Sequence, residues 1–255
     1  MKKILTFLSL LLCCSEPAMA QDDLFGTEKK KPLKGFIISL HGVFDVPMAD
    51  MADRFGVSYR VGPSVFYKTS GNWMLGLKAD FLFGNKIKEP GFLSNMIGTR
   101  DGVLNASGFR TTITTLERGF LFGVQAGKIF NLNSNRPDNG ILALTSVGFM
   151  QHKILVSNRD QNIPQLDNEY LHGYDRLANG FFVEEFVGYN HFSASGLVNF
   201  NIGLNVLAGF TKGRRDVHFD TRQPGNESRL DMLIGVKGSW YIPIVKRKSE
   251  ELFFE

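Results

Sequence analysis

The sequence is nearly free of cysteine, since its 255 residues contain only two, Cys13 and Cys14. Both lie in the apolar segment at the start of the chain, so no thiol follows residue 14. Disulfide bonds and thiol chemistry are therefore excluded from the rest of the chain. An exported protein of this size without disulfides must be held together by other means.

Long apolar runs and a strong net charge are missing too. No stretch reaches the roughly 18 unbroken apolar residues that a membrane-spanning helix needs. The 29 Lys and Arg nearly balance the 25 Asp and Glu, which argues against nucleic acid as a partner. There is no G-x-S-x-G motif, no phosphate loop, no internal repeat and no metal-ligand spacing, so the sequence predicts no cofactor and no metal.

Residues 1–20, MKKILTFLSLLLCCSEPAMA, have the three parts of a secretory signal peptide. The charged pair Lys2 and Lys3 is followed by an apolar core and by an A-x-A cleavage site ending at Ala20. We therefore expect the mature chain to begin at Gln21. A lipoprotein is the alternative, because cysteines follow the leucines, but neither has the small preceding residue that a lipobox needs.

Strict alternation of apolar and polar residues is the main pattern in the rest of the chain. In LVNFNIGLNVLAGF, residues 197–210, three asparagines and a glycine occupy one face and apolar residues the other. Strands of soluble sheets are about five or six residues long, whereas this run is long enough to cross a membrane. Seven more segments alternate in this way, at 35–46, 57–68, 73–84, 119–130, 140–152, 180–192 and 229–242.

Eight such segments predict an all-β fold, an eight-stranded antiparallel up-and-down transmembrane β-barrel over residues 35–245. The abundance of Phe and Gly and the near-neutral mean hydropathy agree with it. The alternative is a soluble periplasmic β-sandwich, which has no reason to segregate its connections by length. Short turns are expected at 69–72, 131–139 and 193–195, and longer loops at 47–56, 85–116, 154–178 and 212–228.

The predicted topology implies a location in the outer membrane, with the long loops extracellular and both termini periplasmic. Residues 21–34 are then a flexible periplasmic tail, and residues 246–255 form a second, charged periplasmic tail. Outer-membrane lipid and lipopolysaccharide are the expected surroundings.

Inward side chains fill the lumen of an eight-stranded barrel. The cations among them are expected to pair with Asp80 and with either Glu184 or Glu185, and nearby glycines to leave room for these charges. The two glutamates are adjacent and face opposite sides, which a bulge or a carboxylate near the membrane interface would explain. We interpret the lumen residues as a structural plug, with a small solute- or lipid-transport barrel as the alternative. The predicted lumen network consists of Arg60, Lys78, Asp80, Gln125, Glu184, Asn199, Asn201, Asn205 and Lys237.

One short motif suggests catalysis. His191-Phe192-Ser193 resembles the H-x-S pair of the lipid A deacylases, which are eight-stranded barrels with a Ser nucleophile. Ala194 stands where that family has Asn, and no acid follows on the next strand. The predicted topology also puts His191 at the periplasmic end. We therefore expect an interfacial histidine and no enzyme, with a lipid-modifying enzyme as the least favoured alternative.

The loops carry mixed charge. The segment 212–228 suits either a self-packed, salt-bridged loop or a surface that contacts a partner or lipopolysaccharide phosphates. Its candidate contact residues are Arg214, Arg215, Asp216, Asp220 and Arg222.

Three stretches resemble a known group of proteins: GVFDVPMADMADRFGVSYRVGPS at 42–64, IPQLDNEYLHGYDRLANGFFVEEFVGYN at 163–190 and GFTKGRRDVHFDTR at 209–222. They are similar to the small outer-membrane barrels of Bacteroidota, including the PorT-like and PorG-like barrels associated with type 9 secretion. The resemblance implies a non-enzymatic scaffold or accessory subunit of a secretion or outer-membrane assembly machine, with other envelope proteins as partners. It supplies no catalytic residues.

Overall fold

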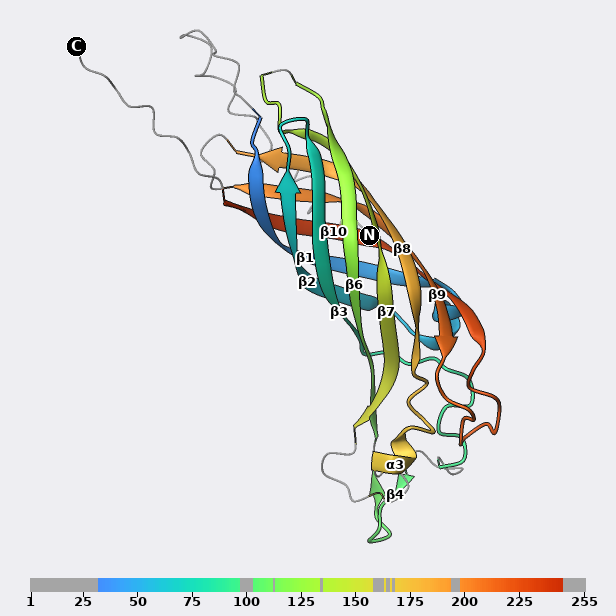
Figure 1. Cartoon of the computed structure of the whole chain (residues 1–255). Helices are drawn as coiled ribbons and strands as arrows, with labels where there is room; N and C mark the ends of the chain where they lie inside the picture. Colours follow the sequence, from blue (N-terminus) through green and yellow to red (C-terminus); the bar gives the residue numbers. More distant parts are fainter. Residues whose placement is uncertain are drawn as a thin grey trace, which may run out of the picture.

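A computed structural model describes residues 32–96, 103–111, 113–133, 135–157, 163, 166, 168–193 and 198–244. Eight long antiparallel strands form a closed ring in the order β1-β10-β9-β8-β7-β6-β3-β2, so the predicted eight-stranded barrel is confirmed (Figure 1). The strands are β1 (Gly35–Ala49), β2 (Ser58–Lys68), β3 (Trp73–Gly84), β6 (Thr114–Asn131), β7 (Gly140–Ser157), β8 (Ala178–Phe192), β9 (Asn199–Gly213) and β10 (Ser228–Ile244).

The ring closes between the first and the last strand. β1 pairs with β2, where Asp45 is opposite Ser58, and with β10, where Val46 is opposite Ile234. Closure leaves no strand edge, so the backbone hydrogen bonds of the wall are satisfied without water.

The connections at the two ends of the barrel differ in length, with one exception. Short segments join β2 to β3, β6 to β7 and β8 to β9 at one end, here called the turn end. At the other end, here called the loop end, three of the four connections are longer than any of these, and 50–57 between β1 and β2 has the same length as 132–139 between β6 and β7. The loop end, with α3 and β4, is in the lower part of Figure 1. The loop-end segments contain α2 (Asp50–Arg54), β4 (Val103–Leu104), β5 (Arg110–Thr111) and α3 (Asn168–Leu171).

The strands reach further into the loop end than the alternation predicts. β6 begins at Thr114 and β7 ends at Ser157, five residues beyond the predicted limits of 119 and 152. These two strands pair with each other over their whole length. They form a hairpin that extends the wall toward the loops.

The outer face of the wall is apolar, as the alternation predicts, whereas the inner face is polar in its middle and carries large apolar residues on either side. Outward residues such as Leu77, which is 62% exposed, alternate with buried ones such as Arg60, which is 0% exposed. Aromatic residues lie toward both ends of the outer face, among them Phe36, Trp73 and Tyr59.

Glu184 and Glu185 are accommodated without a bulge. β8 pairs residue by residue with β7 and β9, so Glu184 is buried in the bore and Glu185 is exposed on the outside. Glu185 is also the central residue of β8, far from either strand end. The bulge offered from the sequence as an explanation is therefore wrong.

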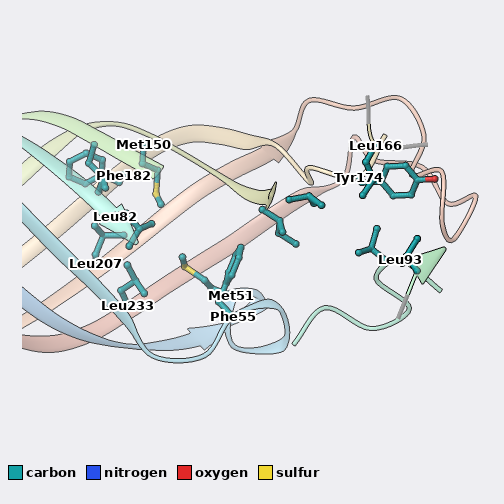
Figure 2. Close-up of a cluster of buried hydrophobic side chains, with 14 of the residues drawn as sticks. Met51, Phe55, Leu82, Leu93, Met150, Leu166, Tyr174, Phe182, Leu207 and Leu233 are labelled. Atoms are coloured by element: carbon teal, nitrogen blue, oxygen red, sulfur yellow. The ribbon is translucent and has the colours of Figure 1, made fainter. Parts of the chain in front are cut away.

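Two apolar clusters fill the bore on either side of a charged layer. Three successive inward residues of β8 mark the three layers. Phe182 belongs to the loop-end cluster, Glu184 to the charged layer and Phe186 to the turn-end cluster. In Figure 2 the loop-end cluster continues past Met51 and Phe55 of the β1–β2 connection into the loops. The turn-end cluster consists of Ile37, Phe66, Met74, Ile129, Leu142, Leu144, Phe186, Phe192 and Tyr241.

The last residues before β1 are anchored, unlike the flexible tail predicted for 21–34. The backbone N–H of Leu33 donates to both carboxylate oxygens of Asp138, at 3.0 and 3.1 Å. Lys68 Nζ lies 2.6 Å from Asp138 Oδ1 and donates to the Leu33 carbonyl. The chain therefore joins the turn end before the first strand begins.

The predicted signal peptide, most of the N-terminal tail and the tail at 246–255 lie outside the described residues. Among the described residues, no helix is long and apolar enough to cross a membrane.

Candidate functional site

Arg60 is the centre of the charged layer. Its guanidinium binds Asp45 of β1 in bidentate fashion, with Nε–Oδ2 at 2.6 Å and Nη2–Oδ1 at 3.2 Å. Nη1 lies 2.7 Å from Glu184 Oε1, and Nη2 donates to Asn205 Oδ1 at 2.5 Å. Nη1 also lies 3.4 Å from Asp80 Oδ2 of β3, so one side chain of β2 is bonded to four other strands by charge-assisted hydrogen bonds.

Lys78 completes this layer from β3. Its Nζ contacts Glu184 and lies 2.8 Å from Asp80 Oδ2. His41 Nε2 lies 2.8 Å from the other oxygen of Asp80, and its Nδ1 lies 3.3 Å from Ser64 Oγ. We call Asp45, Arg60, Lys78, Asp80 and Glu184 the central charge cluster.

Lys237 lies beside the cluster without joining it. It is buried, but no ion pair or hydrogen bond to its ammonium is found among the described residues, and its Nζ lies 5.6 Å from the centre of the Phe186 ring. The expected pairing with Glu184 is not formed, because Arg60 and Lys78 already occupy both oxygens of that carboxylate. With Lys237, three cations balance the three carboxylates of the bore's middle.

The predicted amides do not form one network. Asn205 accepts from Arg60 of the central charge cluster, and Gln125 reaches the edge of the cluster by donating to Ser64 Oγ at 3.4 Å. Asn201 bonds to the hydroxyl of Tyr241, and Asn199 Oδ1 accepts from the backbone N–H of Ser193 at 3.0 Å. Asn199 and Asn201 therefore order the turn end.

The inward glycines make room mainly for backbone, which differs from the prediction. A Cβ on Gly62 would lie 1.9 Å from the Ala79 carbonyl oxygen, and one on Gly123 would lie 2.7 Å from the Val147 carbonyl oxygen. At Gly235 the Asp45 carboxylate is close as well, at 2.5 Å, after the Phe44 carbonyl oxygen at 2.2 Å. Close approach of neighbouring strands is thus the first requirement for glycine here.

A second polar group lies nearer the loop end and was not found from the sequence. His152 Nε2 lies 2.8 Å from Asp231 Oδ2, and Thr211 Oγ1 donates to the same oxygen at 2.5 Å. Glu117 accepts from Ser58 Oγ at 2.6 Å. All of these side chains are buried. Glu117 lies on β6 between the predicted loop, which ends at 116, and the predicted strand, which begins at 119, so no alternation pointed to it.

Ion pairs order the loops that cover the barrel. Glu89 accepts from Arg54 Nε at 2.7 Å and from Arg176 Nε at 3.3 Å. Arg176 Nη2 lies 2.7 Å from Asp220 Oδ1, and the other Asp220 oxygen accepts from the Leu93 N–H at 2.9 Å. We call this group of ion pairs the loop cap. It joins all four loop-end connections.

Two of the five candidate contact residues are engaged inside the loops. Asp220 is part of the loop cap, and Arg215 binds Asp175 with Nη2–Oδ2 at 2.5 Å, a hydrogen bond that raises the pKa of Arg215. Arg214 donates to Asn179 at 2.5 Å but is exposed. Asp216 and Arg222 are exposed as well.

His218 lies buried between these loops. Neither ring nitrogen has a hydrogen-bond partner among the described residues. Burial, followed by the like charges of Arg176 and Arg229, lowers the pKa of His218 to about 4. The imidazole is therefore neutral near neutral pH.

The His191 ring is not oriented by an acid among the described residues. The His191 ring lies against Tyr189 and Phe200, with centroids at 6.4 and 5.3 Å. Its Nδ1 lies 3.3 Å from Asn139 Nδ2, and no carboxylate bonds to it among the described residues. A histidine that activates a nucleophile needs an orienting group, usually an acid. Within the described residues, no three His, Cys, Asp or Glu gather as metal ligands either.

No protein-family model and no curated protein matches the chain. Among solved structures it is similar to Neisserial surface protein A, with a TM-score of 0.45, 8% identity, and coverage of 82% of this chain and 97% of that one. It is also similar to Ail, the attachment invasion locus protein of Yersinia pestis, with a TM-score of 0.41, 10% identity and coverage of 82% and 99%. The outer membrane protein OprG from Pseudomonas aeruginosa has a TM-score of 0.36, 11% identity and coverage of 83% and 98%. At these identities the likeness concerns the barrel fold alone.

Proposed function

We propose that this chain is an integral outer-membrane barrel that acts without catalysis, as a scaffold or accessory subunit for other envelope proteins. The apolar outer face supports the membrane location, because a closed apolar wall of this kind is stable in lipid and aggregates in water. The loop end is proposed to be extracellular and the turn end periplasmic, following the usual division of loop lengths. The resemblance to PorT-like and PorG-like barrels supports a secretion or assembly machine as the setting.

The filled bore is the observation that carries a non-transport role. Arg60 and Glu184 are fully buried and meet between two apolar clusters, with the loop cap beyond. An eight-stranded barrel has room for side chains only. Because the interior is occupied, contacts with other molecules are made by the loops and the outer wall.

The exposed loop residues Arg214, Asp216 and Arg222 are the proposed contacts with a partner protein or with lipopolysaccharide phosphates. Two of them are arginines, which suit bidentate binding of carboxylate and phosphate.

The test is affinity purification of a tagged copy from native outer membranes in mild detergent, with proteins identified by mass spectrometry. We expect stoichiometric recovery of other envelope proteins, lost in an Arg214→Glu/Arg222→Glu variant and kept in Lys128→Glu at the turn end of the wall. Recovery of the barrel alone from wild-type membranes would contradict the proposed function.

A further inference from the structure

Glu185 occupies the middle of the surface that faces lipid. Between the outward aromatic residues Phe181 and Tyr189, the outward residues of β8 are Val183, Glu185 and Val187. At about 3.3 Å per residue and a tilt of about 40°, Glu185 lies roughly 10 Å from each aromatic residue along the barrel axis. This depth is the centre of the hydrocarbon layer, provided that the barrel inserts as proposed above.

Only one of the two carboxylate oxygens of Glu185 has a hydrogen-bond donor among the described residues. Thr145, directly opposite on β7, donates its hydroxyl to Oε2 at 3.0 Å. No other hydrogen bond or ion pair reaches this carboxylate among the described residues. The outward basic residues Arg118 and Lys128 lie toward the ends of β6, away from this depth.

A lone carboxyl group at this depth is costly unless something satisfies it. Lipid tails offer no hydrogen-bonding group there, and neither does the other neighbouring wall residue, Val206 of β9. Ionisable residues inside a membrane commonly mark a contact or a pathway. The bore is filled, so a contact on the outer wall is the fitting explanation.

A second copy of this chain has the matching group at the matching depth. Copies that insert in the same direction can form a closed pair only about an axis along the membrane normal. Each residue of one copy then faces residues of the other copy at the same depth. At this level the second copy presents its own Glu185 and Thr145. Carboxyl groups of two copies that meet at this depth can hydrogen-bond to each other, and each then supplies the partner that lipid lacks.

The surroundings of Glu185 allow two walls to approach closely. Two of its four diagonal neighbours on the outer face are alanines, Ala143 of β7 and Ala208 of β9, and the other two are Val147 and Leu204. Ala126 of β6 is opposite Thr145. Small residues around a polar group are typical of packed interfaces in membranes.

We propose that the wall of β7 and β8, centred on Glu185, is a dimer interface with a second copy of this chain inside the membrane. The inference depends on the membrane insertion in the proposed function and not on its partner proteins. Glu185 and its counterpart form the polar centre of the interface, and the alanines form its close-packed rim.

The test measures dimerisation of the full mature chain in lipid vesicles, by single-molecule photobleaching over a range of protein-to-lipid ratios. Glu185→Leu removes the carboxyl group from the lipid face and leaves folding intact, because a leucine there suits lipid. Glu185→Gln keeps a donor and an acceptor. Ala143→Trp adds bulk to the proposed interface, and Val61→Trp adds the same bulk on β2, on the side of the ring opposite β8.

We expect wild type, Glu185→Gln and Val61→Trp to dimerise at similar ratios, and Glu185→Leu and Ala143→Trp to need ratios at least about tenfold higher. A monomeric wild type across the range, or a Glu185→Leu variant that dimerises like wild type, would overturn the proposal. A monomer in vesicles that captures another envelope protein only when Glu185 is present would also overturn it and assign the surface to that protein. Failure of the chain to float with vesicles at all would instead contradict the proposed function.

Discussion

Arg60 and Glu184 form an ion pair across the bore, with Nη1 2.7 Å from Oε1 and both side chains buried. Their strands, β2 and β8, lie on opposite sides of the eight-stranded ring. The pair therefore joins opposite walls in a place where water does not compete for the hydrogen bonds.

Removing the guanidinium should destabilise the barrel strongly. In Arg60→Met, the carboxylates of Asp45 and Glu184 lose a partner inside the bore, which costs about 3–5 kcal/mol when a buried pair is broken. Urea unfolding in detergent, followed by tryptophan fluorescence, measures the free energy of unfolding. Lys128→Met is the control, because that lysine lies outside, over the Trp73 ring, and should cost less than about 1 kcal/mol. Equal stabilities of the two variants would contradict the role given to Arg60.

Two glycines on the barrel wall make a matched pair for testing strand approach. A Cβ on Gly148 would lie 1.9 Å from the Phe122 carbonyl oxygen, whereas one on Gly42 meets nothing within 4 Å. We expect Gly148→Ala to lose at least about 1–3 kcal/mol of stability, as overpacking does, and Gly42→Ala to change little. The same unfolding assay compares them. Similar values for both variants would show that the strands adjust freely.

The loop cap should open when its central arginine is removed. Arg176→Ala leaves Glu89 and Asp220 without their shared partner beneath the loops. We expect limited proteolysis to cut the loop-end segments at least about tenfold faster, while the strands stay protected. Arg214→Ala, an exposed change in the same region, should match wild type. Unchanged cutting of Arg176→Ala would argue against an ordered cap.

The loop cap should also weaken in mild acid through His218. Its pKa is about 4 in the folded cap against an ordinary value of 6.5. Between these values the opened loop binds more protons than the folded one, so the contribution of His218 to stability falls as the pH drops from 6.5 to 4 and does not change with pH above 6.5. Proteolysis of the loops at several pH values measures this. His218→Gln should remove the part of the pH dependence that falls in this window, and an unchanged profile would contradict the assignment.

The strands and the inward position of Arg60 are predictable because alternation marks both faces of a wall, and a charge in lipid is costly. The hydrogen-bond partners of Arg60 are harder to predict from the sequence. Asp45 and Asn205 meet it through the stagger of the strands, which alternation in a single strand does not encode. The neighbouring glutamates show the same limit, because only the register decides that Glu185 faces outward.

The ion pairs of the loop cap could not be predicted from the sequence for a different reason. Glu89 and Arg176 are far apart in the chain and lie in connections without periodicity. Their meeting depends on how four loops fold over one mouth. Only the mixed charge of the segment 212–228 hinted at a self-packed loop, and Asp220 is the residue there that joins the cap.

The most direct test of a filled, non-conducting barrel is the electrical conductance of the purified chain in a planar lipid bilayer. Because the central charge cluster and both apolar clusters occupy the bore, we expect no steady current above that of the bare bilayer. The Arg60→Met variant, if folded, should stay silent too, because the apolar clusters remain. Steady, ion-selective openings of the wild-type chain would contradict the account and favour a transport barrel.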